Sequence, residues 1–557
     1  MEKDRERKKE SWIVRGYESI ILFLSLLFIV VLLWIALFST SVISPDFNEH
    51  TYFTKSSVLR NTVLIIFIII LTIILGRDKR IQKFITSFNK NSQRYQKTER
   101  ILFLILAGIL AWWVLKLDCQ PKADQQLIME TVKHMRFGDF TDFEKNGYVS
   151  RNAQQFGIVM TEYLLSFLSG TENYLALQLL NIPGVLLCYF MMEGILKETG
   201  VTPWIRMMTI FACILFFPFS MYVIFVYGTV WGLALALLSI YLEIRFFHDM
   251  QWKNLFLCCI SITAAVFLKS NYEIFLIAMI LTAVMEAIRK KKGKILLLPF
   301  VMIVFLCGEK GIFDMMMHRL AGEEYAAPMS SWTWVAIGTS ENDVMADGWY
   351  SDAIGNDIYQ LSNGDSEVDE ILTRKIVIRN LETYRKEPER FIRFILNKTA
   401  SQWNNPTFQC FWIVQRAPHV KTSLTQDPFV KNAYRYLKGW QICILTGAVC
   451  YLLSRERKRP EDLILLLIFV GGFVFHLFWE AKCQYTVVYF ILLIPYAIQG
   501  YQSLAEKKIS GKVLIALLIL VIAGSTLLPV YSANVKVLQK DAWPALKDEQ
   551  DPWGFTS

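Results

Sequence analysis

The stretch ILFLILAGILAWWVLKLDCQPKADQQLIME, residues 101–130, carries the pattern on which the predicted fold depends. Residues 101–115 are apolar, as in a helix that crosses a bilayer. Two carboxylates, Asp118 and Asp124, follow at the point where such a helix would leave the membrane. A charged group at this depth is costly unless it faces water, a pocket or a partner. The pattern therefore predicts either a chemically active pocket or an ordinary solvated loop.

The composition indicates a polytopic membrane protein. Of the 557 residues, 54% are hydrophobic and only 19% are charged, and the mean hydropathy is +0.36. Soluble domains carry about 25% charged residues. The net charge of +9 comes from short basic clusters between apolar segments, rather than from one basic face of a soluble domain. We therefore expect no nucleic-acid partner, and the basic clusters mark the loops that stay in the cytoplasm.

The basic clusters and the apolar runs together predict a topology. Residues 1–10 are rich in Lys and Arg and precede an apolar run over 20–43, which predicts a cytoplasmic N-terminus and a retained first helix. Further cytoplasmic markers follow at 77–100, 289–294 and 455–459. The result is an all-α polytopic fold with about 13 transmembrane helices in the plasma membrane and an outer C-terminal tail.

The count requires that one apolar segment, residues 156–168, does not cross the membrane. This segment is short and carries Glu162, so we expect a helix that lies in the outer interface. In the outer loops, the spacing also predicts an amphipathic helix over 126–135, and two helices within 367–403 that are separated at Pro388.

This topology divides the chain into six parts. They are, in chain order, N-terminal transmembrane helices with a basic loop (1–117), a first outer loop (118–173), a transmembrane core (174–312), a large and mostly helical outer loop (313–437), C-terminal transmembrane helices (438–531) and an outer tail (532–557).

Two predicted hairpin tips carry charges on the same outer face as Asp124. Lys269 interrupts a long apolar hairpin, and it is either a snorkelling lysine or a cation for an anionic headgroup. At the second tip, Glu480 and Lys482 either neutralise each other or place an ammonium beside Tyr485, which suits a phosphate group. The large outer loop adds Trp349 and Tyr350, which fit an interfacial belt or stacking on sugar rings.

Several chemistries have no support in the sequence. It contains no Gly-rich phosphate loop, no HExxH, no CxxC pair and no GxSxG, and its ten cysteines show no spacing typical of a disulfide framework. No internal repeat relates the two halves, and few ionisable residues lie at mid-depth, where a secondary transporter would have its site. Polar residues gather instead on one predicted face.

The order of several short motifs resembles the GT-C superfamily of integral membrane glycosyltransferases. The bacterial members that are similar to dolichyl-phosphate-mannose protein mannosyltransferases (family 39-like) and to lipid A aminoarabinose transferases come nearest. The matching segments, within residues 118–496, are Pro121-Lys-Ala-Asp124, Gly138-Asp139-Phe140, Gly147-Tyr148, Ala153-Gln-Gln155-Phe-Gly157, Tyr227-Gly228-Thr229, Lys269-Ser-Asn271, Ala346-Asp-Gly348-Trp349-Tyr350, and Trp479-Glu-Ala-Lys482 with Tyr485.

The resemblance implies roles for individual residues. Asp124 would be the general base that takes the proton of an acceptor hydroxyl, and Lys269 and Lys482 would stabilise the phosphate that leaves. The remaining substrate-binding candidates are Gln155, Trp349, Tyr350, Glu480 and Tyr485. The chain departs from the family at Gln125, where many relatives have Glu, and at Asp118-Cys-Gln, which is not the metal-binding Asp-x-Asp. No cofactor is indicated, and metal dependence stays open.

The predicted function is that of an enzyme, an inverting glycosyltransferase at the outer face of the membrane. The donor would be a polyprenyl-phosphate-linked sugar, and the acceptor an envelope glycan, lipid or protein. The competing prediction is a non-catalytic transporter or flippase for glycolipids. A third is an enzyme of the same fold that binds the donor without turnover.

Overall fold

The computed structural model describes residues 11–43, 49, 51–117, 119–342, 345–415, 427–454 and 458–509. Within these ranges, nine helical segments are long and apolar enough to cross a membrane, or ten if one bent pair counts as a single span. The chain is therefore a multi-pass membrane protein. The nine segments are α2 (Trp12–Phe38), α3 (Val58–Arg77), α5 (Ser92–Leu117), α9 (Tyr174–Glu198), α12 (Thr229–Asp249), η4 with α14 (Ser270–Lys290), η5 with α15 and η6 (Gly293–Glu324), α23 (Pro460–Phe478), and α24 with η8 and α25 (Cys483–Ala505).

Three segments bear on the predicted count of about 13 spans. The apolar residues 207–226 form most of α10 (Pro203–Leu215) and then a short helical segment (Pro218–Ile224) at 58° to it. Pro218 starts that second segment, where its ring and missing N–H suit a break in the helix. α13 (Trp252–Leu268) is apolar but has only 17 residues. The last predicted span and the tail lie outside the described residues.

The first apolar run is helical only up to Phe38, so the prediction of one helix through residue 43 is wrong in its last part. Residues Ser39–Ile43 form strand β1, which pairs antiparallel with β2 (Thr51–Lys55) in a two-stranded sheet. Three of the five residues of β1 are β-branched, which favours a strand. The Asn404 side chain at the end of α20 donates to the Ser39 carbonyl over 3.0 Å and fixes this hairpin.

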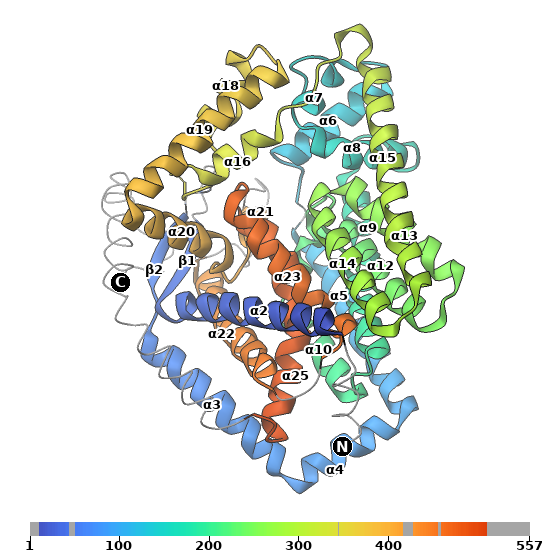
Figure 1. The fold of residues 1–557 in the computed structure, drawn as a ribbon, viewed down its shortest axis with the longest axis vertical. Helices are drawn as coiled ribbons and strands as arrows, with labels where there is room; N and C mark the ends of the chain where they lie inside the picture. The colour runs from blue at the N-terminus through green and yellow to red at the C-terminus, as the bar shows by residue number, and fades with distance from the viewer. Residues whose placement is uncertain are drawn as a thin grey trace.

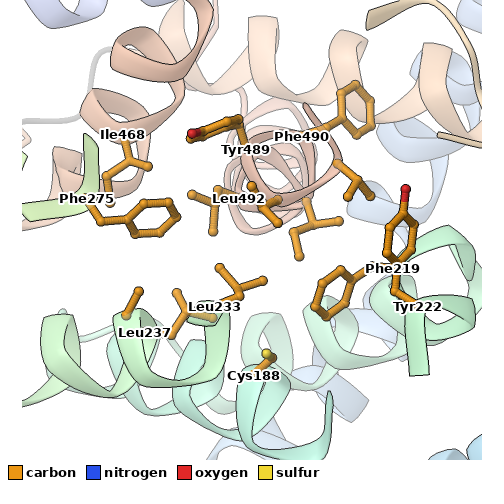
Figure 2. Packing of buried hydrophobic residues seen from close by; sticks show 14 of the residues in the cluster. Cys188, Phe219, Tyr222, Leu233, Leu237, Phe275, Ile468, Tyr489, Phe490 and Leu492 are labelled. Atoms are coloured by element: carbon orange, nitrogen blue, oxygen red, sulfur yellow. The ribbon is translucent and has the colours of Figure 1, made fainter. Parts of the chain in front are cut away.

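The core of the transmembrane region forms around α12, which packs against α9 and α13. Figure 2 shows Leu233 and Leu237 of α12 pointing toward Phe275 of α14 and Ile468 of α23, and all four side chains are fully buried. In a bilayer such contacts stabilise the helices through close packing, because lipid tails are as apolar as leucine. This packing holds the helix ends, and the loops between them, in fixed positions.

Shorter helices gather at one end of the molecule, where α6 (Asp124–Arg136), α7 (Tyr148–Arg151), α8 (Phe156–Ser169) and α16 (Ser331–Thr339) lie, whereas α4 (Lys79–Lys90) lies at the opposite end (Figure 1). The predicted helices over 126–135 and 156–168 are confirmed as α6 and α8.

The predicted break at Pro388 is confirmed between α19 (Ser366–Lys386) and α20 (Pro388–Trp403). α15 (Leu297–Ala321) continues through residue 313, where the large loop was expected to begin. The remaining elements are η1 (Thr141–Phe143), η2 (Ala153–Gln155), α11 (Pro218–Met221), η3 (Tyr222–Ile224), α17 (Asp352–Gly355), α18 (Asp357–Leu361), α21 (Cys410–Gln415) and α22 (Asp427–Leu452).

Candidate active site

A cavity of about 560 Å³ lies where loops from distant parts of the chain meet. Asp124 lines it together with Lys269 and Lys482, the two lysines predicted at separate hairpin tips. Four other predicted site residues also line it, namely Gln155, Tyr350, Glu480 and Tyr485. Further lining residues bear on the chemistry: Glu49, Tyr148, Arg151, Tyr227, Asn271, Trp334 and Asp352.

Asp124 is the first residue of α6, so its carboxylate lies at the positive end of the helix dipole. The preceding residue, Ala123, has a φ of +49°, a backbone conformation that residues with a Cβ rarely adopt. The Tyr227 hydroxyl donates to Oδ2 of Asp124 over 2.8 Å, and Gln155 Nε2 donates in turn to the Tyr227 oxygen. This chain of hydrogen bonds fixes the orientation of the carboxylate.

Tyrosine side chains surround this carboxylate. Burial, and secondly the negative charge of Asp124, raise the pKa of Tyr148. Burial raises the pKa of Tyr227 in the same way, again with Asp124 as the next cause. Both phenols therefore stay protonated at neutral pH and can act as hydrogen-bond donors beside Asp124.

Lys269 lies at the turn between α13 and α14. Its Nζ donates to Thr229 Oγ1 over 3.1 Å and lies 4.5 Å from the centre of the Tyr227 ring and 5.6 Å from that of Tyr485. Burial lowers the pKa of Lys269 to about 7, although the charges of Asp124 and Glu480 oppose this shift. Gly228 allows this turn to approach, because a Cβ at Gly228 would lie 2.6 Å from the Leu268 carbonyl oxygen.

The tip between α23 and α24 carries the second lysine. Lys482 Nζ pairs with Glu49 over 3.1 Å, and Glu480 accepts a hydrogen bond of 3.2 Å from the Tyr485 hydroxyl. Burial raises the pKa of Glu480 to about 7, while Lys482 and Tyr485 act in the opposite direction. The pKa of Lys482 is raised despite burial, because Glu49, Tyr485 and Glu480 favour its charged form.

Lys398 of α20 holds this tip in place through hydrogen bonds to backbone carbonyls. Its buried Nζ donates to the carbonyl oxygens of Leu477 at 3.1 Å, Trp479 at 2.9 Å, and Gly338. Burial lowers the pKa of Lys398 to about 7. The tip is fixed further by Ala481, whose backbone N–H donates to the Gly348 carbonyl over 2.7 Å.

The structure does not bring Trp349 into the cavity. This side chain is 1% exposed, and its Nε1 donates to Ser401 of α20 over 2.8 Å. Its neighbour Tyr350 and Trp334 of α16 are the aromatic residues of the large loop that do line the cavity. Trp349 is instead buried against α20.

Several charged lining residues were missed by sequence reasoning, among them Glu49, Arg151 and Asp352. Glu49 follows the β1 strand, and nothing in its surroundings in the sequence marked it as part of a site. Arg151 ends α7, directly before the segment predicted to be interfacial. The only sign in the sequence that Arg151 belongs to the site was its position within residues 138–157, where several of the matching motifs lie. Tyr227 belonged to a matching motif, but its contact with Asp124 comes only from the fold.

Among the described residues, no group of three or more His, Cys, Asp or Glu side chains is arranged to hold a metal ion. Asp118, whose contribution was left open, lies outside the described residues. No family model, curated protein or solved structure matches this chain. The resemblance to GT-C enzymes therefore rests on the sequence motifs.

Proposed function

We propose that this chain is a membrane glycosyltransferase that moves a sugar from a polyprenyl-phosphate donor to an acceptor hydroxyl at the outer face of the plasma membrane. The observation that carries the proposal is the common cavity of Asp124, Lys269 and Lys482. A base and two cations converge there from segments that lie far apart in the sequence. Such a set of groups is what this transfer requires.

Asp124 is assigned the role of general base. The acceptor oxygen attacks the anomeric carbon of the sugar and loses its proton to the Asp124 carboxylate. The bond between the anomeric carbon and the phosphate oxygen breaks, and its electron pair stays on the phosphate. One displacement of this kind inverts the anomeric configuration. The hydrogen bond from Tyr227 holds the carboxylate in place for this step.

The lysines are assigned to the leaving phosphate. Within the described part of the chain, the Lys269 ammonium contacts a hydroxyl and two aromatic rings but pairs with no carboxylate, so it can accept an anionic ligand. Fixed cations stabilise charge that develops in the transition state. Lys482 forms an ion pair with Glu49, and the phosphate would compete with the Glu49 carboxylate for the Lys482 ammonium. The donor would reach the cavity laterally from the bilayer.

The proposal is tested with the purified full-length protein in proteoliposomes. A panel of polyprenyl-phosphate hexoses, labelled in the sugar, is incubated with wild type and with Asp124→Asn. We expect label to leave the lipid with wild type, and transfer to fall by about 10²–10⁴-fold with Asp124→Asn. Equal transfer by both forms would show that Asp124 is not the base.

The same proteoliposomes distinguish the alternative. If neither form transfers label but a fluorescent donor lipid changes leaflet faster than in empty liposomes, the protein is a transporter or flippase. If donor binds without transfer or leaflet exchange, the chain is an inactive relative of such enzymes. A lipid in which the phosphate is methylated to remove its charge serves as the control for specific binding.

A further inference from the structure

Arg151 is a further cationic residue that lines the same cavity as Asp124. It is the last residue of α7, and its Nε is buried without a hydrogen-bond acceptor. No carboxylate of the described ranges forms an ion pair with its guanidinium. A guanidinium stays charged at every physiological pH and presents its donors in a planar fork that fits phosphate or carboxylate.

Three other partly or fully buried arginines among the described residues are paired. Arg206 contacts Glu193, Arg289 contacts Glu286 over 2.6 Å, and Arg459 contacts Asp462 over 2.7 Å. Leaving a buried donor without an acceptor is unfavourable, so native proteins seldom do it without a functional reason. Arg151 differs from these three in forming no ion pair within the described residues, and it lines the cavity.

Arg151 lies close enough to the catalytic region for its field to be felt there. Burial raises the pKa of Tyr350 to about 12, and Arg151 opposes this shift while Asp124 adds to it. The pKa of Tyr148 responds in the same two directions to the same two charges. These tyrosines thus lie in the fields of both the arginine and the carboxylate. A group bound at Arg151 would therefore lie in the same cavity as Asp124.

We propose that Arg151 binds a second anionic group of the substrates, a phosphate or a carboxylate, separate from the phosphate at Lys269 and Lys482. The assignment rests on the proposed function for its substrates, but the anion site itself does not. Two sources share this chemistry. One is the second phosphate of a diphosphate-linked donor, and the other is an acidic group on the acceptor.

The test uses the reactivity of Arg151 in the wild-type protein. The detergent-solubilised full chain is treated with phenylglyoxal, which modifies arginines, and modification is followed by mass spectrometry with and without inorganic phosphate. We expect phosphate to slow modification of Arg151 roughly tenfold, as expected for a ligand near saturation. Exposed Arg379 of α19 is the control in the same sample, and its rate of modification should be the same with and without phosphate. Equal rates at Arg151 with and without phosphate would overturn the proposal.

A second measurement decides the matter if Arg151 proves unreactive. Calorimetric titration with inorganic phosphate is compared for wild type, Arg151→Gln and Arg151→Lys. The proposal expects Arg151→Gln to lose one class of binding site and Arg151→Lys to keep it with weaker affinity. Identical titrations for wild type and Arg151→Gln, with both proteins folded, would reject it.

Two lipids distinguish the sources of the anion. Protection of Arg151 by polyprenyl diphosphate but not by polyprenyl monophosphate assigns the site to the donor. Protection by inorganic phosphate but by neither lipid assigns it to the acceptor. Protection by the monophosphate lipid would place Arg151 at the same phosphate as Lys269 and Lys482, and would overturn the proposal of a separate anion site. These readouts need no turnover, so the anion site can stand even if sugar transfer is not found.

Discussion

The Tyr227 hydroxyl donates a hydrogen bond of 2.8 Å to Oδ2 of Asp124, although the two residues are separated by 103 positions in the chain. Gln155 donates to the same tyrosine oxygen, so the hydroxyl proton must point at the carboxylate. Tyr227 therefore orients the Asp124 carboxylate, the proposed base.

Replacing Tyr227 with Phe should reduce turnover without preventing donor binding. A hydrogen bond to a charged group contributes about 1.5–3 kcal/mol, so we expect kcat to fall roughly ten- to hundredfold while KM stays nearly constant. Steady-state kinetics with the labelled donor measure this. The control is Tyr496→Phe, which removes a hydroxyl that donates over 2.8 Å to the Asp462 carbonyl, outside the cavity. Equal kcat for the two variants would contradict an orienting role.

Donor binding should weaken as the pH rises through about 7. Because burial lowers the pKa of Lys269 to about 7, its ammonium loses its charge above this pH. Glu480, with a pKa raised to about 7, gains negative charge over the same range. Both changes disfavour a bound phosphate. The Kd of polyprenyl-phosphate mannose, a diester of constant charge, should therefore rise between pH 6 and about 8.5.

Lys269→Arg provides the matched control for this pH dependence. A guanidinium keeps its charge throughout the range, so the rise in Kd should become smaller. Glu480→Gln should remove the remaining part. A wild-type Kd that does not change with pH would show that neither group acts on the bound phosphate.

Hydropathy was enough to predict the class of protein and most of its long helices, because the membrane requires runs of apolar residues whatever the tertiary structure. The break at Pro388 was also local information, since the ring of proline excludes the helix interior. The same rules predicted a helix through residue 43. The structure ends it at Phe38, where pairing with residues 51–55 outweighs continuation of the helix.

Residues of the site were predictable only where a motif, or a charge at the end of an apolar run, marked them in the sequence. The positions of Asp124, Lys269 and Lys482 followed from charges at the ends of apolar runs, and the fold brings all three to one cavity. The Glu49–Lys482 pair could not be found in this way, because it joins segments more than four hundred residues apart. Trp349 failed as a candidate because composition does not distinguish a tryptophan that faces a cavity from one that packs a loop.

Glu49→Gln should tighten phosphate binding while it destabilises the free protein. The Glu49 carboxylate occupies Lys482 at 3.1 Å and competes with an incoming phosphate for the same ammonium. Without this competition, we expect the Kd of polyprenyl phosphate to fall roughly three- to tenfold. The melting temperature without ligand should also fall, because one partner of a largely buried pair is lost. Binding and thermal unfolding assays measure the two effects on the same samples.

The control for Glu49 is Glu341→Gln, which removes the partner of Arg390 outside the cavity. This substitution should leave the Kd unchanged, because the ion pair between Glu341 and Arg390 is partly exposed and neither residue lines the cavity. Weaker phosphate binding by Glu49→Gln would show that Glu49 positions Lys482 for the phosphate rather than competing with it.

Lys398→Met should loosen the tip that carries Glu480 and Lys482. The methionine fills a similar volume but leaves the carbonyls of Gly338, Leu477 and Trp479 without their common donor. Each buried carbonyl without a partner costs about 1–3 kcal/mol. We therefore expect a lower melting temperature and faster amide hydrogen exchange over residues 477–485.

The control is Lys386→Met at the exposed end of α19, which should change neither the melting temperature nor the exchange rate. Exchange over 477–485 that stays at the wild-type rate in Lys398→Met would mean that the contact between Ala481 and Gly348 fixes the tip alone.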